Sequence, residues 1–463
     1  MSVELDDNVI INKTKVLSNF LAKTTLADIP VEVVERAKLT IADTLGVAIN
    51  GSIEPEMQKL YERLPQGGEI SIIRKGFPKT SDISMAGLAN ATAICFVELD
   101  EGAPPSGHPA LHVLPPTLAM SQLLGKSGSE FLEAFILGYE VHFRVQKATV
   151  LQESVYPHGN TGHVGAVVAV GKLLGWNAEQ FRQGINCAAA LPLGTSYEPC
   201  LAGSTIASVF PSLSAPIVFI IKDLIESGFT GYDNALSDTF GKILGESFDP
   251  QVLTEKLGVD FGIMNNHFKF HATCGVIHPS LEAIADALNF TLQHGEYPPY
   301  KSDVLLNPND IMSIKIRVNN IRALRLMNLA ENKKLSAKFS LPFAVATYLV
   351  TGNANVESIC KESLENPQVR MLEKLVSLEV DPEINIKNSK NILAKVTIKL
   401  KNGEVITGKC QKIYGRSENP SKDIDIFNKF ISLTDGILDE EKKNSIWRRI
   451  TSLEELENMR EIF

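Results

Sequence analysis

The chain has 463 residues, enough for two or three domains, and its 44% hydrophobic and 21% charged residues are typical of a globular protein. The formal net charge is −9, with no basic stripe and no block of like charge, so nucleic acid and membranes are disfavoured as partners. The six cysteines stand singly, without the Cys-x-x-Cys pairs of zinc or redox sites. Because the first residues lack the basic and apolar regions of a signal peptide, we expect a cytoplasmic protein.

Apolar residues recur at helical period between Pro30 and about Phe261, which predicts a helical first half. The run Val164–Leu174 is apolar on all sides and rich in glycine, which indicates a central buried helix closely approached by its neighbours. Stop and capping signals predict further helix ends: a stop at Asn50-Gly51 for a helix over 31–49, and capping boxes at Ser127–Glu130 and Asn177–Gln180.

After about residue 262, apolar residues alternate at period two in Ser313–Val318 and Ala394–Leu400, the pattern of β-strands. Asn402-Gly403 follows the second strand and predicts a hairpin. Helices are expected over Ser280–Leu288 and Ala337–Val350. The predicted fold class is therefore mainly α: a large all-helical domain (1–267), a smaller α+β lid domain (268–404) inserted before the C-terminal helices, and a segment (405–463) that rejoins the helical domain.

The stretch from Glu98 to Thr117 carries the densest group of titratable residues, between two apolar runs. Its prolines and glycines predict a turn that enters the core and returns, and Pro109 and Pro115 argue against a regular helix there. Buried titratable groups are either fully paired or functional. No metal site is predicted, because no zincin pattern accompanies the histidines. The titratable residues are Glu98, Asp100, Glu101, His108 and His112.

Other stretches add candidates for binding an anion. Tyr156–His163 precedes the buried glycine-rich helix, whose N-terminal N–H groups would favour a carboxylate. Leu201–Ser212 is small and hydroxylated, with no cation. Lys269 lies between phenylalanines, so its charge is desolvated unless an anion meets it, and burial in an empty site would lower its pKa. The alternatives are core histidines in these stretches and a Lys269 that reaches solvent.

The sequence contains no Walker loop, Rossmann fingerprint, nucleophile elbow or kinase motif, which argues against nucleotide and nicotinamide cofactors. The remaining groups suit proton transfer on a carboxylic acid without a cofactor. Motifs along nearly the whole chain also occur together in one known family: Leu39–Ala48, His108–Pro115, Pro157–Ala166, Leu201–Thr205, Phe268–His271, Ala337–Ala346 and the Asn402-Gly403 hairpin.

In these motifs the chain resembles the MmgE/PrpD family, which includes 2-methylcitrate dehydratase, cis-aconitate decarboxylase and iminodisuccinate epimerase. The resemblance implies a homodimer that binds its substrate between a helical domain and a lid. Only His108 and Lys269 match the family pattern cleanly. The chain departs from the family pattern at four places. It has Glu98 where the family has an aspartate, Gly102 in place of a threonine, Tyr156 in place of a histidine, and Ala207 or Ser208 in place of an arginine or lysine.

A charge-assisted hydrogen bond to a carboxylate contributes about 1.5–3 kcal/mol, so the missing cation and histidine predict a substrate less anionic than citrate. We expect a cofactor-free lyase, a dehydratase or decarboxylase, that acts on a small carboxylic acid such as one from a specialised biosynthetic pathway. The alternatives are an isomerase, epimerase or cyclase that uses the same site, and an inactive relative that binds a partner or metabolite.

The roles expected from the resemblance and the local chemistry are proton transfer by His108, orientation of His108 by Glu98 or Asp100, and carboxylate binding by Lys269. No cofactor or metal is expected, and the expected partner is a small carboxylate. The remaining candidates are His158 for catalysis, and Tyr156, His163, His271, Ser204 and Thr205 for substrate binding.

Overall fold

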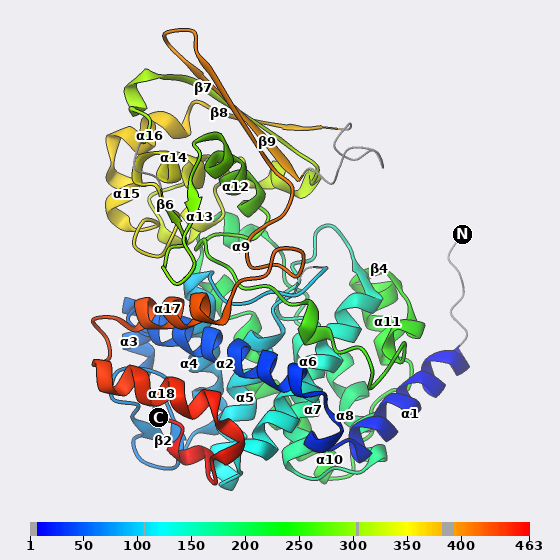
Figure 1. The fold of residues 1–463 in the computed structure, drawn as a ribbon. Helices are drawn as coiled ribbons and strands as arrows, with labels where there is room; N and C mark the ends of the chain where they lie inside the picture. The colour runs from blue at the N-terminus through cyan, green and yellow to red at the C-terminus, as the bar shows by residue number, and fades with distance from the viewer. Residues whose placement is uncertain (1–6, 106, 302–304, 382–392) are drawn as a thin grey trace.

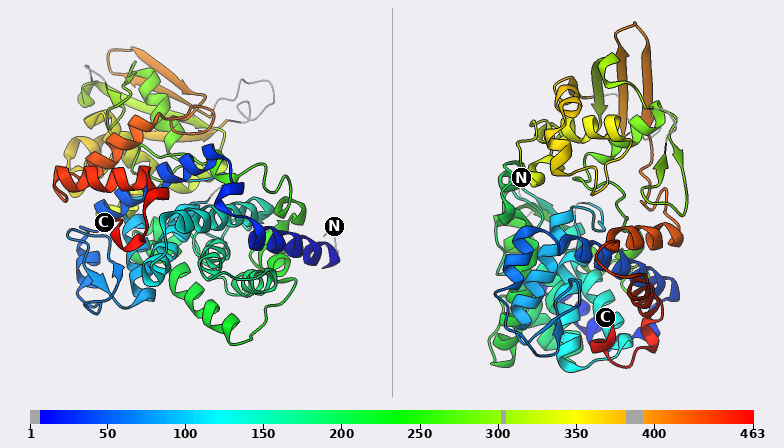
Figure 2. Two further views of the ribbon diagram at one scale, coloured as in Figure 1. Left: turned by 60° about the horizontal axis from the view of Figure 1, so that its bottom comes forward. Right: turned by 90° about the vertical axis from the view of Figure 1, so that its left-hand side faces the viewer.

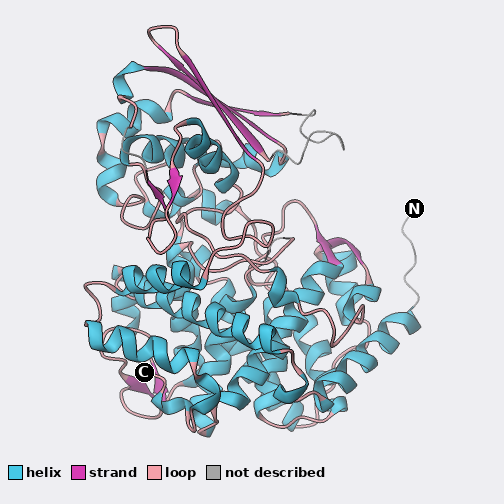
Figure 3. Cartoon of the chain, in the orientation of Figure 1, coloured by secondary structure: helices cyan, strands magenta, loops and turns pink. Residues whose placement is uncertain are grey.

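The computed structural model describes residues 7–105, 107–301, 305–381 and 393–463. Helices dominate the described chain, and strands gather in one smaller part of it (Figure 3). The predicted fold class, mainly α, is confirmed. We call the large helical part the helical body and the smaller part, which holds the four-stranded sheet, the α+β region (Figure 1).

The helical body is organised around α7 (Gly162–Leu173), which packs against α5, α6, α8 and α10. All but one of the α7 residues are buried, which confirms the predicted central helix. The capping boxes predicted at Ser127 and Asn177 are present at the starts of α6 and α8. The helices of the body are α1 (Asp7–Lys23), α2 (Val31–Gly51), α3 (Pro55–Tyr61), α4 (Ile83–Val97), α5 (Pro109–Leu124), α6 (Gly128–Ala148), α8 (Ala178–Ala189), α9 (Glu198–Leu201), α10 (Ser214–Glu226) and α11 (Ala235–Asp238).

Glycine lets α6 and α7 approach each other closely. A β-carbon at Gly165 would lie 2.4 Å from the carbonyl oxygen of Gly138, so neither helix could carry a side chain at this crossing without moving apart. The two helices are in contact along their length. The close packing expected from the glycine-rich sequence is therefore present.

Helix α5 corrects the prediction that prolines would prevent a regular helix after His108. Pro109 occupies the first turn, where its missing N–H costs nothing, and His108 is the N-cap residue. The helix then continues through Pro115 and Pro116, although each removes one backbone hydrogen bond. Every α5 residue up to Gln122 is buried, so tertiary packing outweighs the local effect of the prolines.

The sheet of the α+β region has the strand order β10-β9-β7-β8, with β7 (Ile311–Val318) parallel to β8 (Val376–Val380). The predicted hairpin joins β9 (Ala394–Leu400) to β10 (Val405–Cys410), and Gly403 has the positive φ that its turn requires. The sheet thus extends past residue 404. The division of the chain into three domains stays a prediction.

The helix expected over Ala337–Val350 is in fact two helices, α13 (Lys334–Lys338) and α14 (Leu341–Thr351). Ser340 separates them, because its hydroxyl accepts a hydrogen bond from the Phe343 N–H at 3.2 Å and caps α14. The other elements of this region are α12 (His278–Ala287), α15 (Lys361–Glu365), α16 (Pro367–Glu373), β5 (Thr291–Leu292) and β6 (Tyr300–Lys301). Short strands elsewhere are β1 (Ile70–Ser71), β2 (Lys79–Thr80), β3 (Thr149–Leu151) and β4 (Gly245–Phe248).

After β10 the chain returns to the helical body as α17 (Asp423–Thr434) and α18 (Glu440–Thr451). Both helices contact α2, and Phe430 and Ile450 join the core that contains α2 (Figure 2). Within the described residues, Thr205–Glu226 is the stretch whose length and composition would suffice to cross a membrane. Half of it is buried against the body, as in a core helix, and the absence of a membrane partner stays a prediction.

Candidate active site

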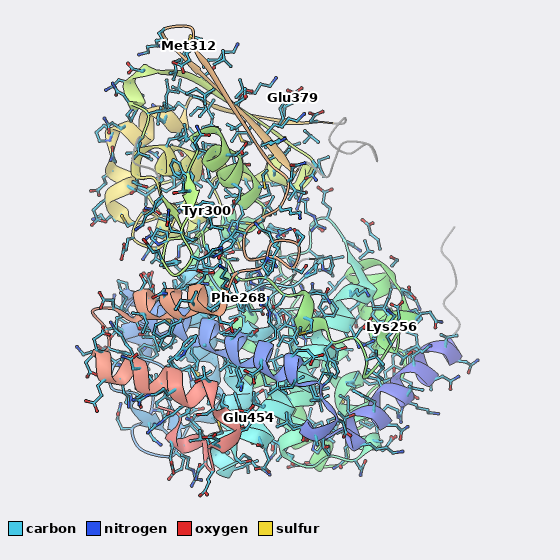
Figure 4. The ribbon with its side chains drawn as sticks, viewed as in Figure 1. Lys256, Phe268, Tyr300, Met312, Glu379 and Glu454 are labelled. Atoms are coloured by element: carbon cyan, nitrogen blue, oxygen red, sulfur yellow. The ribbon has the colours of Figure 1, made fainter. Side chains whose placement is uncertain are left out.

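A cavity of about 310 Å³ lies where the helical body meets the α+β region, close to Phe268 in Figure 4. The groups facing it are chemically diverse, with carboxylate, imidazole, phenol, thiol, ammonium and guanidinium side chains. They are Glu98, His108, Tyr156, His158, Tyr197, His267, Lys269, Cys274, Arg322, Arg416 and Glu418.

His108 and Asp100 form the central ion pair of the site. The His108 Nδ1 lies 2.8 Å from Asp100 Oδ2, and the two side chains are 15% and 2% exposed. Burial lowers the pKa of His108, but Asp100 more than reverses this and raises it above 6.5. Burial raises the pKa of Asp100, but the His108 and Lys269 charges bring it below its usual value. Each member of the pair therefore favours the charged form of the other.

Glu101 lies in the same loop but does not face the cavity. Its carboxylate accepts hydrogen bonds from the Ala110 N–H at 2.8 Å and from the Tyr139 hydroxyl at 2.9 Å. Burial raises the pKa of Glu101 to about 7. This side chain holds the start of α5, and with it His108, against α6.

Lys269 is 1% exposed and makes an ion pair with Glu98, whose Oε1 lies 3.1 Å from the lysine Nζ. The Glu98 carbonyl oxygen accepts a second hydrogen bond at 3.0 Å. Burial lowers the pKa of Lys269, but Glu98 and Asp100 raise it above its usual value. The expectation of a lowered pKa was wrong, because it did not count the counter-ions. An ammonium has three N–H donors, so one remains for a substrate carboxylate.

His158 lies beside the ion pair, with its ring tilted against that of His108 at a centroid distance of 4.7 Å and edge-on to that of Tyr156 at 4.8 Å. Tyr197 continues the row at 4.6 Å from Tyr156. Burial, followed by the His108 charge, holds the pKa of His158 well below its usual value. His158 is therefore neutral, and it shapes the wall of the cavity as a hydrogen-bonding group.

The other predicted binding residues do not line the cavity. His163 is buried within α7, and its ring nitrogens have no hydrogen-bond partner among the described residues. His271 packs against His278 and Tyr348 in the α+β region. Ser204 and Thr205 are exposed on a short turn. We leave these four residues out of the proposed site.

The structure adds His267, which lines the cavity. Gly102 and His267 form an isolated β-bridge, and a β-carbon at Gly102 would lie 2.7 Å from the imidazole. The His267 ring thus occupies the space beside Gly102. Burial and the charge of Arg416 keep the pKa of His267 well below its usual value, so this imidazole is neutral.

Arg322 and Arg416 bring two cations to the cavity that the sequence analysis did not indicate, since it named only Lys269 as a cation of the site and found none at Ala207 or Ser208. Arg416 follows β10, and its Nε is buried without a hydrogen-bond partner among the described residues. Burial lowers the pKa of Arg416, and the charge of Glu418, which lines the same cavity, offsets only part of that shift. Nothing in the sequence near either arginine connects it to the His108 loop.

Two further features lie outside the cavity. A broader groove of about 850 Å³ shares Pro104, Pro105 and Asn265 with it, but no histidine is among the described residues that line the groove. No group of three or more His, Cys, Asp or Glu side chains is arranged to hold a metal ion in the described ranges. The chemistry of the site thus centres on His108, Asp100 and the cationic groups around them.

Two family models match the chain: the MmgE/PrpD N-terminal domain over residues 15–241 and the MmgE/PrpD C-terminal domain over residues 271–455. The chain belongs to the MmgE/PrpD family. The cavity lies between the two matched parts, and Lys269 stands just before the second.

Curated relatives cover most of this MmgE/PrpD chain. A human protein named cis-aconitate decarboxylase is 25% identical over 92% of the chain and 88% of its own length. A cis-aconitate decarboxylase of Aspergillus terreus is 24% identical over 97% of the chain and 95% of its own length. A cis-aconitate decarboxylase-like protein of Aspergillus oryzae is 24% identical over 96% of the chain and 95% of its own length. The family and these relatives support a lyase that acts on a small carboxylic acid.

Proposed function

We propose that this MmgE/PrpD protein is a cofactor-free lyase for a small dicarboxylic acid, with decarboxylation favoured over dehydration. The His108–Asp100 pair carries the proposal, since it puts a charged acid/base group against a cavity with three cationic side chains. The names of the curated relatives support decarboxylation. Cofactor independence, the homodimer and the cytoplasmic location stay predictions.

Asp100 determines which ring nitrogen of His108 can donate a proton to a substrate. Because the aspartate holds Nδ1, the imidazolium presents Nε2 as its remaining acid. Loss of carbon dioxide leaves the electron pair of the broken carbon–carbon bond on the substrate, and a proton from His108 Nε2 neutralises it. In a dehydration, the same imidazole in its neutral form would instead remove a proton from carbon, and the imidazolium so formed would give that proton to the hydroxyl, which leaves as water.

The substrate carboxylates have two separate partners. Lys269 provides its remaining N–H donor near Glu98, and the unpartnered Nε of Arg416 provides a second cationic contact. A dicarboxylate would use both and is less anionic than citrate. His158 and Tyr156 would form the wall between them.

The experiment compares wild-type protein with His108→Gln on a panel of mono-, di- and tricarboxylic acids that includes cis-aconitate. Carbon dioxide release and product mass are recorded in deuterated and ordinary water. We expect loss of carbon dioxide or water from a dicarboxylate, and about a 10²–10⁴-fold lower turnover in the variant. His294→Gln, which changes a partly exposed histidine outside the cavity, is the matched control.

Other outcomes would replace the proposal. A product of unchanged formula that carries solvent deuterium would identify an isomerase or epimerase. Thermal stabilisation by an acid without any turnover would identify a binding relative. Full activity in a folded His108→Gln variant would remove His108 from the mechanism.

A further inference from the structure

Buried lysines hold the C-terminal end of α4, directly before the carboxylates of the site. Each donates hydrogen bonds to main-chain carbonyl oxygens in this short segment. Lys338 binds the oxygens of Phe96 and Val97, the latter at 2.7 Å; Lys269 binds that of Glu98 at 3.0 Å; Lys429 binds that of Leu99 at 2.9 Å.

The geometry of this helix end explains why lysines are needed. The last carbonyls of a helix lack intrahelical partners, and here they belong to a buried segment that includes Phe96, Val97 and Leu99. Glu98 has φ 55° and leaves the helix in the left-handed conformation, so the chain turns sharply. Ammonium groups satisfy the carbonyls and also complement the negative end of the helix dipole.

Lys338 differs from the other two lysines in its partners. Lys269 pairs with Glu98, and Lys429 pairs with Asp43 at 2.6 Å. Lys338 is 1% exposed and makes no ion pair among the described residues. Within the described chain, its hydrogen-bond partners are the two carbonyl oxygens at the end of α4. Burial, followed by the charge of Lys334, lowers the pKa of Lys338 to about 7, and its hydrogen bonds to the end of α4 are formed at that cost.

The lysines also come from different parts of the molecule. Lys338 ends α13 and Lys269 follows Phe268, on the side of the α+β region, whereas α4 belongs to the helical body. Lys338 also receives a hydrogen bond on its own carbonyl from the N–H of Cys274, which lines the cavity. The α+β region thus contacts the end of α4 and the cavity through the same residue.

We propose that Lys338 is a positioning residue for the acid/base pair. Through the Phe96 and Val97 carbonyls it fixes the turn at Glu98, and so holds Asp100 against His108 when the α+β region is docked on the helical body. Only the catalytic role of these carboxylates rests on the proposed function. The positioning itself can be measured without a substrate.

The test measures the pKa of His108 by NMR in full-length protein with ¹³C-labelled histidine, and His108→Gln assigns the signal. Removal of a nearby positive charge would raise this pKa, whereas loss of contact with Asp100 would lower it toward 6.5. In Lys338→Met we expect a fall of about 0.5 to 1 unit. Faster amide exchange is expected at residues 98–101.

Lys172→Met is the matched control, because Lys172 also binds two carbonyls at a helix end, those of Leu21 and Thr24 after α1. It should lower stability without moving the pKa of His108. If Lys338→Met does not fold, Lys338→Arg is measured instead. Its guanidinium group is larger than the lysine amine, so it displaces both carbonyls while keeping the positive charge. An unchanged or raised His108 pKa in the folded variant would overturn the proposal, whether or not a substrate is known.

Discussion

The Nδ1 of His108 lies 2.8 Å from Oδ2 of Asp100, and both residues belong to the loop between α4 and α5. Helix α4 fixes one end of this loop through the left-handed turn at Glu98. Helix α5 fixes the other end, where Glu101 accepts a hydrogen bond from the Ala110 N–H. Two buried helices therefore set the geometry of the acid/base pair before a substrate arrives.

Replacing Asp100 by asparagine should change the pH dependence of turnover. The aspartate raises the pKa of His108, so Asp100→Asn lowers that pKa and moves the alkaline limb of kcat/KM to lower pH, by about one unit. The measurement is a full pH–rate profile of both proteins. A limb that stays in place would show that another group controls it.

The same variant should lose stability in a defined pH window. The pKa of Asp100 is lowered from 3.8, so its contribution is present above pH 3.8 and disappears as pH falls through the folded value. The pKa of His108 is raised from 6.5, so its contribution is present below pH 6.5 and disappears as pH rises through the folded value. Urea denaturation should show the largest difference between wild type and Asp100→Asn between these limits. An equal difference well above that window would contradict this expectation.

Arg416→Gln should weaken the binding of dicarboxylates selectively. One charge-assisted hydrogen bond is lost, which corresponds to about 10- to 100-fold in affinity. Isothermal titration with succinate and with butyrate, which lacks the second carboxylate, separates this effect from general damage. Equal weakening of both ligands would show that Arg416 only supports the cavity wall.

Gly102 and His267 should behave as a coupled pair. A β-carbon at Gly102 would meet the His267 ring at 2.7 Å, so Gly102→Ala should cost about 1–2 kcal/mol of stability. In a His267→Ala background the same change should cost much less, because the ring is gone. A double-mutant cycle by chemical denaturation measures the coupling. Additive costs would place the effect of Gly102→Ala elsewhere.

The hydrophobic pattern of the sequence predicted correctly those helices and strands whose burial in the fold agrees with that pattern. The apolar helix α7 and the alternating strands β7 and β9 are examples. It failed at α5, since burial on all sides carries the helix through Pro115 and Pro116. It also joined α13 to α14, although Ser340 before Leu-Pro-Phe is a capping signal that could have separated them.

The candidate site could be predicted only where its titratable residues lie close together along the chain. Asp100 and His108 stand eight residues apart, and the sequence singled out both. Arg416 reaches the cavity from far along the chain and has no local signal, so only the fold could reveal it. His163 and His271 do not line the cavity, and the sequence could not separate them from the cavity histidines, because an apolar neighbourhood suits a core histidine as well as a functional one.

Lys269 gives a prediction that separates binding from stability. Lys269→Met leaves the buried Glu98 carboxylate unpaired and should cost about 3–5 kcal/mol, whereas Glu98→Gln with Lys269→Met removes both charges and should recover most of that loss. Carboxylate binding should stay weak in both variants, because the lysine donor is absent. Urea denaturation and titration with succinate measure the two effects. If the double variant binds succinate like the parent, Lys269 supports the turn at Glu98 and does not contact the substrate.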